Sequence, residues 1–200
     1  MKKITATAVA TLGLAIAAAA QAAEPSPWVF RLGVHDVDPK SNNSDIVSVD
    51  SARMLTFNLT RMVDEHWGVE VLAALPFQHD IRLNTGGKVA EVKHLPPTVS
   101  VQYHFSPGAK FRPYVGAGLN ATLFFDEKTS GALDGHKLSL GTSFGAAAQA
   151  GMDFDITDTW FLNADVRWID IDTKAKLDGA SLGNVAIDPL TFGISVGRRF

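Results

Sequence analysis

Hydrophobic and polar residues alternate strictly in the last segment of the chain. Leu190, Phe192, Ile194 and Val196 occupy every second position, and small or polar residues stand between them. Such alternation places the two sets on opposite faces of a β-strand. In a soluble sandwich the apolar face points into the core, whereas in a membrane barrel it points outward into lipid. The pattern therefore predicts a strand with one apolar face and leaves its direction open.

The same alternation recurs, so that the chain contains eight candidate strands, at 28–34, 55–59, 67–77, 99–105, 115–125, 138–152, 160–168 and 190–197. The connections alternate in length: they are short near residues 64–66, 106–110 and 157–159, and longer elsewhere. Short turns at one rim and long loops at the other are typical of outer-membrane barrels, and an even strand count closes such a barrel. We predict an all-β fold, an eight-stranded antiparallel up-and-down transmembrane β-barrel.

The N-terminal segment has the features of an export signal. Lys2 and Lys3 precede an uncharged, Ala-rich run, and Ala20-Gln21-Ala22 supplies the small residues of a cleavage site. The alternative is a membrane anchor, but an Ala-rich stretch of this length is a poor span. We expect residues 1–22 to be a signal peptide and residues 23–200 to be the barrel, located in the outer membrane of a Gram-negative bacterium.

Composition excludes several classes of function. The formal net charge is −3, it becomes −5 without Lys2 and Lys3, and no basic cluster suggests a nucleic acid partner. The absence of cysteine excludes disulfides and thiolate chemistry. Histidine and aspartate recur near the loop rim, but no serine lies in a recognisable nucleophile motif. His79 and His94 approach one hairpin at a spacing that does not indicate a metal site. We expect no catalytic residue, no metal and no cofactor.

The inward face of the predicted barrel carries charges of both signs. The lumen of eight strands is just wide enough for side chains to fill it or to hold a small ligand. Buried charges need partners, so we expect a lumen network of polar residues, composed of Arg31, Glu70, Gln102, Asp165, Arg167 and Arg199.

Towards the loop rim the inward positions become less polar. The apolar inward residues are Met54, Leu72, Ala74, Phe124, Phe161 and Ile169. They either fill space between strands or form the wall of a pocket for a hydrophobic small molecule, and the pattern does not decide between these interpretations.

Three prolines favour the pocket. Pro76 stands almost opposite Pro96 and Pro97 if the hairpin turns near residues 86–87. Proline donates no backbone hydrogen bond, so facing prolines break the ladder between two strands. In lipid an unpaired backbone is tolerated where it lines a cavity. We predict a lateral opening in the barrel wall here; the alternative is a bulge or kink that only ends the pairing.

Several blocks, in order along the mature chain, carry a specific resemblance; they are residues 67–79, 94–98, 110–120, 169–173 and 197–200. Together they resemble the OmpW family of outer membrane proteins. The resemblance implies an eight-stranded barrel with an apolar channel that opens from the extracellular side. Family members, including the alkane-import AlkL type, are linked to uptake of small hydrophobic molecules. Arg167 departs from the family pattern, because this inward position is often large and aromatic.

The combined expectation is a narrow channel for passive uptake of small hydrophobic molecules, with lateral exit into the membrane. The alternative is a structural, adhesive or receptor barrel with a closed lumen. The expected partners are outer-membrane lipid, small hydrophobic ligands and, during biogenesis, the barrel-assembly machinery. The terminal Phe200 resembles the signal that this machinery reads.

Overall fold

The computed structural model describes residues 28–40 and 47–200. The expected signal peptide, residues 1–22, lies outside the described residues. Among those described, no helix is long and apolar enough to cross a membrane.

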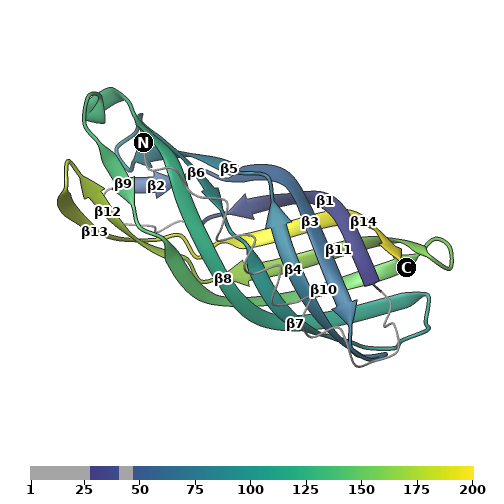
Figure 1. Cartoon of the computed structure of the whole chain (residues 1–200). Coiled ribbons are helices and arrows are strands. Elements are labelled where there is room, and N and C mark those ends of the chain that lie inside the picture. Colours follow the sequence, from purple (N-terminus) through teal and green to yellow (C-terminus); the bar gives the residue numbers. More distant parts are fainter. Residues whose placement is uncertain (1–27, 41–46) are drawn as a thin grey trace.

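The described strands include a closed, antiparallel ring of eight (Figure 1). Each ring strand pairs with the next along the chain, and the last pairs with the first through Val29 opposite Arg199. In order the ring consists of β1 (Trp28–Asp38), β3 (Ala52–Met62), β4 (Trp67–Ala74), β7 (Thr98–His104), β8 (Phe111–Thr129), β10 (Ser143–Asp155), β11 (Trp160–Ile169) and β14 (Leu190–Arg199). The predicted eight-stranded barrel is confirmed.

The apolar face of the barrel strands points outward. Leu119, Phe144 and Ile194 have exposed fractions of 73%, 79% and 71% in the isolated chain, whereas their neighbours Asn120 and Ser195 are buried. The apolar residues therefore face outward, where lipid covers them, and the polar residues fill the interior.

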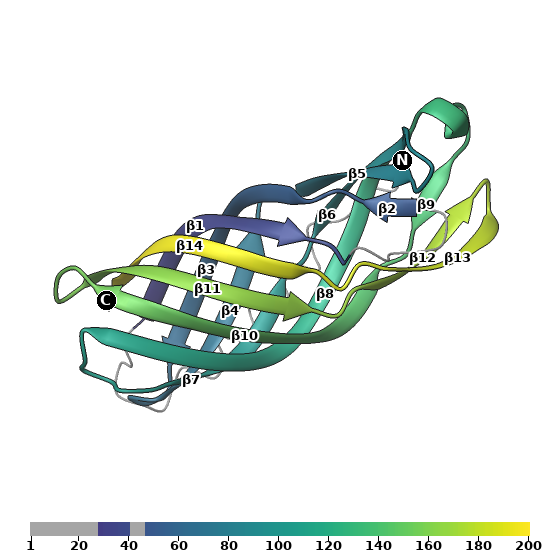
Figure 2. The ribbon, with the colours of Figure 1, turned by 180° about the vertical axis from the view of Figure 1, so that it is seen from behind.

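The two ends of the barrel differ. The short turns and the C-terminus lie at one end, and two hairpins project beyond the ring at the other (Figures 1 and 2). The projecting part consists of β2 (Val47–Val49), β5 (Phe77–Leu83), β6 (Lys88–Leu95), the 3₁₀ turn η1 (Gly131–Leu133), β9 (Leu138–Leu140), β12 (Asp172–Leu177) and β13 (Ala180–Ala186). In the outer membrane, short turns face the periplasm, so the projecting part is extracellular.

Two predicted strands are interrupted. The segment 67–77 divides at Pro76 into β4 and β5, and this break reverses the inside–outside alternation. Phe77, which the alternation placed outside with Trp67, is consequently 2% exposed. The segment 138–152 divides as well: β9 leaves the ring and pairs with β12, and only β10 belongs to the barrel wall.

Candidate functional site

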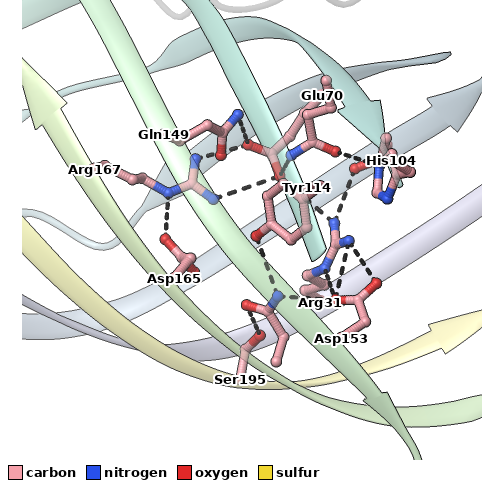
Figure 3. A network of polar contacts seen from close by, with 12 residues as sticks. Arg31, Glu70, His104, Tyr114, Gln149, Asp153, Asp165, Arg167 and Ser195 are labelled. Atoms are coloured by element: carbon pink, nitrogen blue, oxygen red, sulfur yellow. Dashed lines mark hydrogen bonds and ion pairs between the residues drawn. The ribbon is translucent and has the colours of Figure 1, made fainter. Parts of the chain in front are cut away.

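Glu70 is the centre of a buried polar layer that crosses the barrel (Figure 3). It projects inward from β4 and is 1% exposed. Arg167 Nη1 on β11 donates to Glu70 Oε1 at 2.7 Å, and Gln102 Nε2 on β7 donates to Oε2 at 2.8 Å. Gln149 Nε2 donates to Oε1 at 3.2 Å, and Arg31 Nη1 lies 3.6 Å from Oε2. One carboxylate therefore joins residues of four other strands.

A second group of contacts lies on the periplasmic side of Glu70. Arg31 pairs with Asp153 at 3.0 Å, and its guanidinium lies over the rings of Tyr114 and Phe161. Arg199 continues the chain of contacts to Asp153 at 3.3 Å. Each guanidinium thus has a carboxylate partner, as burial of a charge requires.

A third group includes a threonine, a histidine and an aspartate in series. His35 contacts Thr56 Oγ1 at 2.7 Å through Nδ1 and Asp165 Oδ1 at 3.0 Å through Nε2. The order resembles a nucleophile, a base and an orienting acid. However, Asp165 also accepts from Arg167 at 2.7 Å, all three residues are buried, and none of them lines the apolar pocket described below. The series belongs to the polar layer.

The six residues expected to form the lumen network lie in this layer, which we call the polar plug. The plug also contains Gln149, Asp153, Asn163 and His35, which parity places inward without showing which partners they reach. Its charged side chains are paired with one another across the interior, and the lumen of an eight-stranded barrel is just wide enough for side chains to fill it. Apart from Arg199, which is half-buried, its members are buried, and contacts among them link β1, β4, β7, β10, β11 and β14.

An apolar pocket of about 500 Å³ lies on the extracellular side of the plug. One wall comes from β5, β6 and β8, and the other from β9, β12 and β13. The lining is mostly aliphatic and includes Ile81, Val92, Phe124, Leu138, Ala175 and Val185. A concave apolar site with a few polar groups is the usual form of a small-molecule site.

The residues expected to line a channel are placed as follows. Phe124 lines the pocket, and Ile169 belongs to a buried cluster that packs against Phe124. Leu72 is buried and lies opposite Asn58 and Thr98, between plug and pocket, while Met54 and Ala74 are half-buried.

The prediction that Phe161 lines the channel near the loop rim is wrong. It points inward, but it packs with Val29 and Met62 at the periplasmic end, opposite Gly197. Alternation predicts which face of the strand a side chain occupies. The position of the side chain along the barrel axis depends instead on how far the residue lies from the turn at the end of its strand. Phe161 is the second residue of β11, directly after a short periplasmic turn.

Most of the pocket lining was not predicted. Ile171 and Ile187 complete the cluster around Ile169, and Ile187 reaches the pocket. These residues lie where the chain leaves the barrel ring, so the alternation that identifies barrel strands does not extend to them. The isoleucines themselves, in an otherwise polar loop, were the available signal.

Two histidines are part of the apolar wall. The rings of His79 on β5 and His94 on β6 stack with centroids 4.9 Å apart, and Phe77 stacks on the other side of His94. Burial holds the pKa of His94 down to about 3 and lowers the pKa of His79 as well. The Nε2 atoms of both rings are buried without a hydrogen-bond partner.

The three prolines lie at a break in the ladder. β4 and β7 pair as far as Leu72 opposite Thr98, and pairing resumes in the next hairpin with Phe77 opposite His94. Asn120 Nδ2 donates to the carbonyl oxygens of Pro96 and Pro97 at 3.1 and 3.2 Å. A side chain of β8 thus supplies donors to carbonyls at the break. The prolines are not among the residues that line the pocket.

Comparison with known proteins gives consistent matches. The model of the OmpW family matches residues 20–200. Outer membrane protein W of Escherichia coli K12 is 40% identical, with both chains fully covered. Outer membrane protein AlkL of Ectopseudomonas oleovorans is 35% identical over 79% of this chain and 69% of that protein. The crystal structure of OprG from Pseudomonas aeruginosa superposes with a TM-score of 0.77 at 32% identity, covering 88% of this chain and 97% of that one.

Proposed function

This chain belongs to the OmpW family and is an outer-membrane protein, and from this premise we propose that it forms a narrow channel for passive uptake of small hydrophobic molecules. The observation that supports the proposal is an apolar pocket at the extracellular end of a barrel whose interior is otherwise filled with buried, paired polar side chains. A polar solute gains nothing in such a pocket, whereas an apolar molecule loses its contact with water there.

The plug decides the route onward. An apolar molecule that continued along the barrel axis would have to displace ion pairs around Glu70, which is costly because it leaves charges unpaired. The ladder break at Pro76 and Pro96 offers a path sideways. Within residues 28–40 and 47–200, the hydrogen bonds to the carbonyl of Pro96 come from the side chains of Asn120 and Thr98, and such bonds re-form after a local displacement. Lateral exit into the membrane at this break is part of the proposal.

We assign no catalytic residue to this channel. Thr56, His35 and Asp165 belong to the polar plug and do not line the pocket where a substrate would bind. The proposed partners are therefore membrane lipid and small apolar ligands, together with the assembly machinery during biogenesis.

Replacement of Leu72 by Asp tests the channel. Leu72 lies between pocket and plug, so Leu72→Asp puts an uncompensated carboxylate on the route of an apolar cargo. The measurement is uptake of radiolabelled octane by cells that carry equal amounts of folded barrel, judged by heat-modifiable gel mobility. We expect a decrease of at least tenfold relative to wild type. Ala180→Asp adds the same charge on exposed β13 and should leave uptake unchanged.

Equal uptake by the wild type and by Leu72→Asp would contradict the channel. It would favour the structural, adhesive or receptor barrel with a closed lumen.

A further inference from the structure

Two arginines on the outer face of the barrel have no acidic partner within residues 28–40 and 47–200. All the other arginines of the chain form ion pairs with carboxylates; they are Arg31, Arg53, Arg82, Arg112, Arg167 and Arg199. Arg61 on β3 and Arg198 on β14 form neither an ion pair nor a side-chain hydrogen bond with a described residue. A guanidinium group is always charged and has several N–H donors, so both groups keep donors for a partner outside the protein.

Both arginines instead lie over aromatic rings. Arg61 Cζ is 5.2 Å from the ring centre of Trp28, and Arg198 Cζ is 5.0 Å from that of Phe200 and 5.5 Å from that of Trp160. The Phe200 backbone N–H donates to the carbonyl oxygen of Trp28 at 2.9 Å. The five residues therefore form a continuous patch across the neighbouring strands β3, β1, β14 and β11 (Figure 2), which we call the seam patch because the first and last strands of the ring meet there.

The seam patch lies on the lipid-facing side, at the periplasmic end of the barrel. Trp28 and Trp160 are the first residues of β1 and β11, and Phe200 is the C-terminus. Trp160 and Phe200 have exposed fractions of 45% and 66%. Aromatic residues on the outer face of a barrel mark the membrane interfaces, where the strands leave the hydrocarbon layer. The two guanidinium groups therefore lie at the level of the phospholipid headgroups of the periplasmic leaflet.

An anionic phospholipid supplies the partner that these groups lack. Phosphate oxygens accept charge-assisted hydrogen bonds from a guanidinium group, often two in parallel. A zwitterionic headgroup carries its own cation beside the phosphate, and this cation competes with arginine. Attraction to the protein as a whole does not favour an anionic lipid, because the chain has a formal net charge of −3. A preference for such a lipid must therefore come from a local site.

We propose that the seam patch is a binding site for an anionic phospholipid of the periplasmic leaflet. The guanidinium groups of Arg61 and Arg198 bind the headgroup phosphate, and the rings of Trp28, Trp160 and Phe200 pack against the lipid below it. The site lies on the outside of the barrel, away from the polar plug and the apolar pocket. It does not depend on the proposed channel.

Fluorescence quenching by brominated phospholipids tests the site. The background variant Trp67→Phe/Trp168→Phe leaves Trp28 and Trp160, both in the seam patch, as the only tryptophans. The barrel is refolded into phosphatidylcholine vesicles that contain either brominated phosphatidylglycerol or brominated phosphatidylcholine, and quenching at equal mole fractions gives the relative affinity of the two lipids. We expect phosphatidylglycerol to bind about fivefold more tightly, the contribution of one basic residue at a membrane surface.

Arg61→Gln and Arg198→Gln, each in this background, remove one guanidinium group. We expect each to lower the preference for phosphatidylglycerol and the double variant to bring the ratio of affinities close to one. Arg53→Gln is the matched control, because Arg53 also faces outward from β3 but lies at the extracellular end and pairs with Asp36. It should keep the fivefold preference. Both lipids are compared within one variant, so a change in tryptophan emission cancels, and heat-modifiable mobility verifies folding.

Three results overturn the site: a ratio close to one in the background variant, a fivefold ratio that persists in the double variant, and an equal loss of preference in Arg53→Gln, which would assign the preference to overall charge. If the double variant does not refold, the single variants decide, and an unchanged ratio in both overturns the site. None of these results bears on the channel.

Discussion

At the scale of the residue, Glu70 has the greatest effect on the interior. It accepts hydrogen bonds from Gln102, Gln149 and Arg167 and lies near Arg31. Removal of one partner from a buried ion pair costs more than the pair itself contributes, because the remaining charge stays buried. Glu70 is the shared partner of two guanidinium groups, so its loss affects both.

We expect Glu70→Leu to lower the free energy of unfolding by about 3–5 kcal/mol. Urea unfolding in lipid vesicles, followed by tryptophan fluorescence, measures this change. Glu65→Gln, in the exposed periplasmic turn, should stay within about 0.5 kcal/mol of wild type. An unchanged midpoint for Glu70→Leu would show that the arginines find other partners in the lumen.

At the scale of the element, the β5–β6 hairpin owes its position to the break at Pro76. The break shifts the alternation by one residue, so that Phe77, His79 and Ile81 face inward. The hairpin then packs its apolar side, with the histidines, against the pocket. Its stability should depend on pH, because the histidines are neutral when packed.

The direction of this pH dependence follows from the pKa of His94, which is about 3 in the packed hairpin and about 6.5 in an opened one. Below pH 6.5 only the opened hairpin takes up the proton, so opening becomes more favourable as the pH falls. Hydrogen exchange of β6 amides, corrected for intrinsic rates, should show a roughly 25-fold larger opened fraction at pH 5 than at pH 7. His94→Phe should reduce this dependence, and an identical dependence in that variant would assign it to other groups.

At the scale of the whole molecule, the C-terminus closes the ring. Phe200 is 66% exposed, its backbone N–H donates to the carbonyl of Trp28 at 2.9 Å, and the Arg198 guanidinium lies over its ring. A carboxylate at the membrane interface costs little, about 1 kcal/mol or less. The closed barrel therefore does not depend on this aromatic ring for its stability.

We expect Phe200→Asp to impair assembly in cells and to leave refolding in vitro intact. Heat-modifiable mobility of membranes from cells should show little folded barrel, whereas the same variant refolds from urea into lipid vesicles. Phe200→Tyr, which keeps an aromatic end, should assemble like wild type. Normal amounts of folded Phe200→Asp in cells would mean that the terminal aromatic is not read during assembly.

The sequence by itself determined the even number of ring strands and the face on which most of their residues lie. Alternation is a local property, because each residue of a strand faces opposite to its neighbour whatever the rest of the chain does. For this reason the alternation alone puts Arg31, Glu70 and Arg167 on the inward face, and all three are buried. The facing prolines also indicated where pairing stops.

Only the tertiary structure decided which inward residues lie at the same level along the barrel axis. It also decided that the extracellular segments form a pocket. Phe161 faces inward as predicted, but it lies at the periplasmic end of the barrel and not at the extracellular end. The position of a residue along the barrel axis depends on the register of its strand with the neighbouring strands. The pocket joins residues from Val47 to Ile187, and the stack of His79 on His94 depends on the parity reversal after Pro76. These contacts link segments far apart in the chain, and no local pattern specifies which distant residue completes a cavity or leaves a nitrogen without a partner.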